Sequence, residues 1–162
     1  MLRQENMFRG LILDTDIDGN FTGNTTKEWV FGNLIQQYDY VGEGEERHAV
    51  LINTMIKWSG MEAWGGDDEF DVDPKTVGQN TGRDDMEGNP IYADDILFYQ
   101  NIFEPSANRH FVVLWSDEDS AWMAKAPDEY CFFSALEPER CCKIVGTIFG
   151  EPVTEVVNEN NT

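Results

Sequence analysis

The chain has 162 residues and carries 31 acidic against 11 basic side chains, a formal net charge of −20 at pH 7. This length fits one domain or two small domains that share a core, and the 41% of hydrophobic residues indicates a folded chain. A surface this acidic repels phosphate, so we expect no direct binding to nucleic acid. No apolar run approaches the roughly 18 residues of a membrane span, and no signal-peptide pattern is present. We therefore expect a cytoplasmic protein that does not bind membranes.

The acidic side chains are concentrated between residues 67 and 95, where ten of them are opposed by only Lys75 and Arg83. One interpretation is that the charge maintains solubility. The other is that the acidic surface is a decoy for a basic protein surface, including by mimicry of nucleic acid. Composition leaves both interpretations open.

The first predicted element is a hairpin. Apolar residues at 7–13 predict a strand, polar residues at 14–20 a loop, and residues 29–35 the returning strand. The loop contains D-x-D-x-D-G, which places Asp14, Asp16 and Asp18 at the first, third and fifth positions of a calcium-binding loop. Its twelfth position is Thr25 instead of the bidentate glutamate that such a loop requires. We expect a solvated hairpin loop without a metal, and calcium binding is the weaker alternative.

The later elements alternate short apolar runs with Gly, Pro and Asp turns. We predict a loop at 36–47, strands at 48–58, 91–92 and 96–99, and a strand pair at 110–115 and 121–124 around an acidic turn. A helix or helical turn is predicted at 127–140, limited by Pro138, and a last strand at 141–149. Residues 153–162 are predicted to form a disordered tail.

This succession of short strands predicts a mainly β fold with minor helix. We expect a small SH3-like β-barrel in the C-terminal half, with the N-terminal strands packed on it or forming a second β unit. The expected organisation is an N-terminal β region at residues 1–71, a central motif followed by the barrel at residues 72–152, and the tail at residues 153–162.

The cysteines predict no special chemistry. Cys131, Cys141 and Cys142 are odd in number and form no C-x-x-C pair, so neither a disulfide framework nor a zinc site is indicated. We expect buried thiols that pack as small hydrophobic groups, and no cofactor.

The most informative stretch is VDPKTVGQNTGRDDMEGNPIYADDILF at residues 72–98. Two glycines bracket a polar run suited to a turn or bulge, an acidic loop follows, and apolar residues then predict strand. The pattern T-V-G-Q-x-T-G, an acidic turn with glycine and then I-Y-x-x-D-I resembles the central motif of the YopX-like family of phage and prophage proteins. The matching residues are Thr76, Gly78, Gln79, Thr81, Gly82, Asp85, Gly88, Ile91, Tyr92, Asp95 and Ile96.

The resemblance extends to apolar segments near both ends of the chain. Asp94 stands where the family typically has glycine, and aspartate tolerates a positive φ better than most residues. The resemblance implies a phage or prophage origin and a location in the host bacterial cytoplasm. It implies no biochemical activity, because the family has no established one.

We interpret the motif as structural, a hinge between the N-terminal strands and the C-terminal barrel. In this interpretation Tyr92 and Ile96 anchor the turn in the core. Asp85 and Asp95 are the first acid–base candidates, but aspartates in such loops commonly accept backbone N–H bonds, and we favour that role. We therefore predict no catalytic residue.

Two classes of function remain. The sequence contains no G-x-S-x-G, Walker loop, dinucleotide fingerprint or H-E-x-x-H. We therefore favour a non-enzymatic protein-binding or assembly module, directed at a host factor or at a second copy of the chain, because β folds offer grooves and exposed strand edges. The alternative is an enzyme that acts on a small substrate through carboxylates, with or without a metal.

Overall fold

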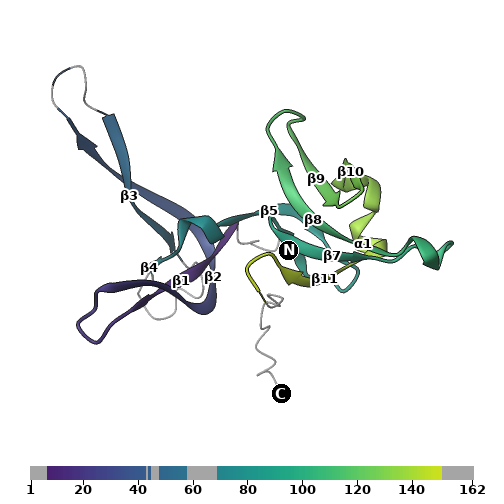
Figure 1. The fold of residues 1–162 in the computed structure, drawn as a ribbon, viewed down its shortest axis with the longest axis horizontal. Helices are drawn as coiled ribbons and strands as arrows, with labels where there is room; N and C mark the ends of the chain where they lie inside the picture. Colours follow the sequence, from purple (N-terminus) through teal and green to yellow (C-terminus); the bar gives the residue numbers. More distant parts are fainter. Residues whose placement is uncertain (1–6, 43, 45–47, 58–68, 151–162) are drawn as a thin grey trace, which may run out of the picture. The chain divides into compact units, whose positions relative to one another are not determined.

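The computed structural model describes residues 7–42, 44, 48–57 and 69–150, so the predicted tail at 153–162 lies outside the described residues. The chain divides into two compact units, Met1–Gln79 and Asn80–Thr162. Both are built from antiparallel strands, which confirms the mainly β fold class (Figure 1). No described helix is long and apolar enough to cross a membrane.

The first unit contains an antiparallel sheet in the strand order β4-β3-β2-β1-β5. Its elements are β1 (Phe8–Thr15), β2 (Phe21–Val41), β3 (His48–Lys57), β4 (Glu69–Asp71), the 3-10 turn η3 (Pro74–Thr76) and the start of β5 (Gly78–Asp84). The order follows the chain through three successive antiparallel connections, and β5 then returns to the other edge of β1.

β2 is longer than the sequence predicted. The returning strand was expected at 29–35 and a loop at 36–47, but β2 starts directly after the hairpin loop and continues to Val41. Residues 21–32 pair with β1 and residues 33–41 pair with β3, so each half of β2 has its own backbone partner. Residues 36–39 are exposed on both faces, and such a ribbon has no apolar alternation from which to predict a strand.

The core of the first unit lies where these pairings meet. Val30, Ile56 and Val72 are buried there, with Phe8, Ile12, Leu34, Phe70 and Val77 packed against them. Gly10 lets β1 approach this core, because a Cβ at that position would lie 3.1 Å from the Cβ of Val72. Arg9, the residue before Gly10, is also buried, and its guanidinium lies 4.8 Å from the centre of the Trp29 ring.

The second unit contains a five-stranded antiparallel sheet in the order β10-β9-β8-β7-β11. Its elements are the end of β5, β6 (Pro90–Tyr92), β7 (Asp95–Tyr99), η4 (Pro105–Ala107), β8 (Arg109–Ser116), β9 (Ala121–Ala126), β10 (Glu129–Phe132), η5 (Phe133–Leu136), α1 (Pro138–Cys141) and β11 (Cys142–Thr147). The predicted hairpin around the acidic turn is present as β8 and β9.

One face of this sheet forms the larger core. Leu97, Phe111, Val113, Ala124 and Cys142 are buried on it, and Phe133 and Leu136 of η5 pack over them. The expected closed SH3-like barrel is not confirmed, because the sheet is open with β10 and β11 at its edges. The chain between those two edges forms η5 and α1, and η5 packs on the core face.

The segment predicted as a helix at 127–140 differs in detail. It contains a turn, strand β10, η5 and three of the four residues of the short α1. Pro138 begins α1 instead of limiting a helix, because proline fits the first helical position, where no intrahelical N–H bond is required. Cys141 and Cys142 are buried, as predicted, whereas Cys131 on β10 is only partly buried. Burial raises the pKa of the Cys142 thiol to about 12.

Candidate functional site

The boundary between the two units lies inside the central motif, between Gln79 and Asn80. Thr76, Gly78 and Gln79 belong to the first unit, and the other motif residues belong to the second. The hinge role of the motif stays a prediction. What each part of the motif does within its own unit is set by hydrogen bonds.

In the first unit, Thr76 ties η3 to β1. Its buried hydroxyl donates to the carbonyl of Asp73 at 2.7 Å and accepts the Leu11 N–H at 2.9 Å. Asp73 also accepts the Lys75 N–H through its carboxylate, which caps the 3-10 turn. Threonine at this position therefore satisfies buried backbone groups of two segments at once.

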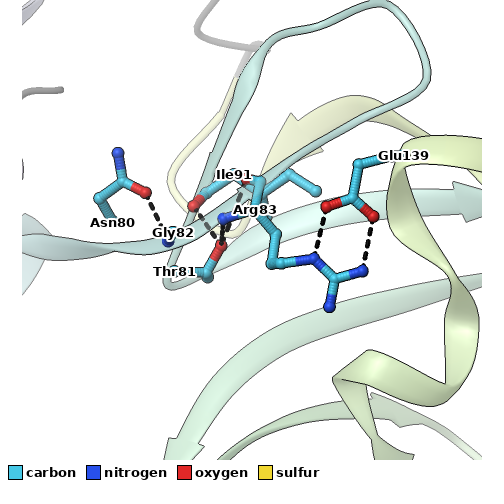
Figure 2. Close-up of polar contacts among 6 residues, drawn as sticks. All are labelled: Asn80, Thr81, Gly82, Arg83, Ile91 and Glu139. Carbon is cyan, nitrogen blue, oxygen red and sulfur yellow. Dashed lines mark hydrogen bonds and ion pairs between the residues drawn. The ribbon is translucent and has the colours of Figure 1, made fainter. Parts of the chain in front are cut away.

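In the second unit, Thr81 organises a bulge where β5 pairs with β6. Its hydroxyl donates to the Ile91 carbonyl at 2.8 Å and accepts the Arg83 N–H at 3.2 Å (Figure 2). Gly82 adopts φ 78° between them, and its N–H donates to the Asn80 side chain at 2.7 Å. The left-handed conformation explains the glycine, because a Cβ would be strained there.

The loop that follows is built around the Asp85 carboxylate. One oxygen, Oδ1, accepts the N–H groups of Glu87 and Asn89, both at 2.9 Å. The backbone closes the same loop, since the Asp85 N–H donates to the Asn89 carbonyl and the Gly88 N–H donates to the Asp85 carbonyl. Gly88 has φ 82°. This is an Asx-type turn in which a side chain replaces a backbone acceptor.

The second carboxylate oxygen of Asp85 reaches strand β11. Oδ2 accepts the Ile144 N–H at 3.1 Å, and the adjacent Met86 N–H donates to the Cys142 carbonyl at 2.8 Å. Asp85 itself is buried, with 2% of its surface exposed. The loop thus occupies backbone groups on the outer edge of β11, which would otherwise be open to pairing with another strand.

Two ion pairs fix the loop to the segment that carries α1 and β11. Arg83 makes a two-pronged contact with the Glu139 carboxylate (Figure 2), and Lys143 lies 2.9 Å from Glu87. The hydrogen bond from Arg83 lowers the pKa of Glu139, and the same bond raises the pKa of Arg83. Both pairs are partly exposed, so each stabilises the loop only weakly, because water screens the attraction.

Asp95 and Asp94 form the bend between β6 and β7. The Asp95 carboxylate is fully buried and accepts the Tyr92 N–H at 2.9 Å. Asp94 adopts φ 71°, donates its N–H to the Val113 carbonyl at 2.8 Å and accepts the Ile148 N–H at 3.1 Å. Aspartate therefore takes up the left-handed conformation at the position where the YopX-like family typically has glycine.

The expected core anchors are only partly correct. Ile91 and Tyr92 are buried, but Ile96 is half-buried on the other face of the sheet, and Leu97 occupies the core. The reason is the direction of Asp95. Its carboxylate points inward, and because successive side chains of a strand alternate between faces, Ile96 must point the other way.

The first hairpin repeats the Asp85 loop. Oδ1 of Asp16 accepts the N–H groups of Asp18 and Asn20, both at 2.9 Å, the Asp16 N–H donates to the Asn20 carbonyl, and Gly19 has φ 83°. Both loops have the sequence D-x-[D/E]-G-N, a recurrence that sequence reading missed because the strands around the loops differ. The hydrogen bond from Asn20 lowers the pKa of Asp16.

The Thr81 bulge also recurs, in the first unit. Thr22 and Thr26 each donate to a carbonyl of β1 and accept the N–H two residues further on, at 3.2–3.4 Å. The residues that follow them, Gly23 and Lys27, have φ 83° and 67°.

The calcium candidates Asp14, Asp16 and Asp18 lie in the hairpin whose loop and bulges resemble those of the Asp85 hairpin. Within residues 7–42, 44, 48–57 and 69–150, no three or more His, Cys, Asp or Glu side chains gather as metal ligands would.

The other face of the β10–β11 sheet is open, and sequence reading did not single it out. Alternation along the strands and the cross-strand register place Ser116, Ala121 and Lys143 on this face, together with Ile96, Phe98, His110, Val112, Leu114, Met123, Lys125, Tyr130 and Phe132. Met123 is buried among them. We call it the open face. Tyr130 and Phe132 are each about half exposed, at 52% and 54%.

The open face is hollowed over β8 and β9. A groove of 440 Å³ is lined by Ile96, Val112, Leu114 and Pro127, among others, and an adjoining hollow of 620 Å³ extends from Leu114 to Tyr130. Few polar groups lie in the first groove, and carboxylates border the second. The arrangement can hold an apolar side chain or an extended segment of chain.

Comparison of the chain with protein-family models, with curated proteins and with solved structures finds no match. The resemblance to the YopX-like family therefore stays a prediction from the motif alone.

Proposed function

We propose that the chain is a non-enzymatic protein-binding or assembly module. The observation that carries this proposal is the open face, where most of the apolar side chains on one side of the sheet remain partly exposed around a groove. Exposed apolar patches that are bordered by polar residues are typical of sites that bind other proteins. The partner is a host protein or a second copy of the chain.

The motif carboxylates support the proposal in a different way. Asp85 accepts backbone N–H groups through both oxygens, and Asp95 accepts one from Tyr92 while fully buried. A carboxylate in such bonds holds a loop in shape, whereas a general acid or base must reach the substrate. These two residues are therefore better suited to a structural role than to the alternative of carboxylate-dependent catalysis.

The origin and location of the protein belong to the same proposal. The motif resemblance supports a phage or prophage protein that works in the bacterial cytoplasm. The charge of −20 supports solubility or a decoy role toward a basic protein.

Affinity capture from a bacterial lysate tests the proposal. The bait is the tagged chain, compared with Leu114→Glu, which places a charge on the open face, and with Ile17→Glu, a control at a fully exposed hairpin tip in the first unit. We expect the parent and Ile17→Glu to capture the same partner in a fixed molar ratio, and Leu114→Glu to capture none of it. Thermal melts of all three baits establish that each is folded. Identical captured proteins for the three baits, with a monomeric parent in sedimentation, would contradict the proposal.

A further inference from the structure

The two edge strands of the five-stranded sheet differ in whether another segment of the chain bonds to their outer backbone groups. The outer edge of β11 is occupied by the Asp85 loop through bonds to Ile144 and Cys142. At the opposite edge, β10 pairs with β9 from Glu129 to Phe132. An edge strand directs alternate N–H and C=O groups outward, and in the described residues no second strand pairs with β10. One edge is thus protected and the other is available to an added strand.

The open face continues to the β10 edge in two cross-strand rows. Ile96, Val112, Lys125 and Tyr130 form one row, and Leu114, Met123 and Phe132 form the other. A strand added beside β10 would extend both rows, with its alternate side chains on the open face next to Tyr130 and Phe132. These aromatic rings offer apolar contact area where the groove meets the edge.

The charges around this edge are mostly negative. The turn before β9 carries Asp117, Glu118 and Asp119, and Asp119 accepts the Tyr130 hydroxyl at 3.3 Å. The turn after β9 carries Asp128, next to Glu129, and Arg109 pairs with both of these carboxylates. Lys125 is the one cation within the two rows. The edge therefore favours a cationic partner, and a second copy of a chain with a charge of −20 would be repelled.

We propose that β10 and the adjoining open face bind an extended segment of another protein, in which apolar residues alternate with Lys or Arg, by adding it as a further strand of the sheet. Main-chain hydrogen bonds supply affinity, and the aromatic row together with the carboxylates selects the sequence. This inference rests on the proposed function and names the partner's chemistry at that surface.

The test uses the full chain and fluorescent octapeptides, with binding measured by anisotropy. The probe alternates Lys and Val. The comparison peptides alternate Glu and Val or Lys and Ser, and a fourth carries N-methyl groups on alternate residues of the Lys–Val sequence, which removes N–H donors. We expect binding of the Lys–Val peptide alone, and weaker binding as salt increases.

A matched pair of protein variants locates the site. Tyr130→Ala removes a ring from the proposed site, and Tyr38→Ala removes a ring of equal exposure, 52%, from β2 in the first unit. Truncation of an aromatic binding residue is expected to lower the affinity for the Lys–Val peptide roughly tenfold. The Tyr38→Ala variant is expected to bind as the parent does.

Three outcomes would overturn the inference. The first is that the Lys–Val and Lys–Ser peptides bind with equal affinity and that Tyr130→Ala changes neither affinity. This result would show that the peptides are attracted by the net charge of the protein alone. The second is no binding of any peptide. The third is self-association of the parent that Phe132→Lys abolishes, which shows that a second copy occupies the edge. In each case the lysate capture with Leu114→Glu still decides the proposed function separately.

Discussion

The carboxylate of Asp85 accepts the backbone N–H of Ile144 at 3.1 Å, and so joins a hairpin loop to a strand that lies 59 residues further along the chain. The same carboxylate holds its own loop through Glu87 and Asn89. One buried side chain therefore shapes a turn and covers the edge of the sheet, and this double role makes its replacement informative.

Asp85→Asn is expected to destabilise the second unit by about 1–3 kcal/mol. Asparagine keeps one acceptor oxygen for the loop, but its amide group would face the Ile144 N–H and leave a buried donor without an acceptor. Asp16→Asn is the matched control, because that loop has the same internal bonds and is exposed. We expect Asp16→Asn to cost much less than Asp85→Asn, because the Asp16 carboxylate is exposed to water. Urea unfolding of the two variants measures both values, and equal losses would show that the bond to β11 contributes nothing.

Leu97→Ala and Ile96→Ala differ by one position on β7 and are expected to differ sharply in stability. Leu97 is fully buried in the larger core, so its truncation should cost about 2–5 kcal/mol. Ile96 lies on the open face, so Ile96→Ala should cost about 1 kcal/mol or less. Denaturant melts compare them directly. A larger loss for Ile96→Ala than for Leu97→Ala would mean that the strand faces are assigned the wrong way round.

Gly82→Ala is expected to cost about 1–2 kcal/mol, because residue 82 has φ 78° and an L-side chain is strained there. Gly146→Ala is the control within the same unit. A Cβ at that position would lie 3.5 Å from the Gly150 carbonyl, an ordinary contact, and its φ is not in the left-handed region. If the two variants melt at the same temperature, the bulge does not depend on the left-handed conformation.

Stability is expected to fall at alkaline pH through Cys142. Burial raises the pKa of its thiol from 9.0 to about 12, so the unfolded chain loses this proton at a lower pH than the folded chain. The contribution is fully present below pH 9 and is lost as the pH rises toward 12, at no more than about 1.4 kcal/mol per pH unit. Urea melts at several pH values measure the slope. Cys142→Ala should flatten it, and an unchanged slope would assign the effect to other groups.

Millimolar calcium is expected to leave the melting temperature unchanged. The Asp16 carboxylate is already bonded to backbone N–H groups, and the bidentate glutamate of a calcium loop is replaced by Thr25. Differential scanning fluorimetry with calcium and with a chelator checks this. A rise of several degrees that Asp16→Ala abolishes would establish a calcium site.

The sequence by itself determined the local structures of this protein. The mainly β class and the hairpin of β8 and β9 follow from apolar runs between Gly, Pro and Asp turns, which act over a few residues. The capping role of Asp85 and the turn glycines of the motif are equally local. For the same reason a careful comparison of D-x-[D/E]-G-N at residues 16–20 and 85–89 could have revealed the repeated loop.

Only the tertiary structure decided which groups meet across the chain. The length of β2 depends on two successive partners, and the inward direction of Asp95 determines the face that Ile96 occupies. The sheet is open, and η5 packs on its core face. The bond from Asp85 to Ile144 and the contrast between the β10 and β11 edges arise in the same way. Pairing between strands is set by contacts that are distant in sequence, and no local pattern of residues encodes the partner.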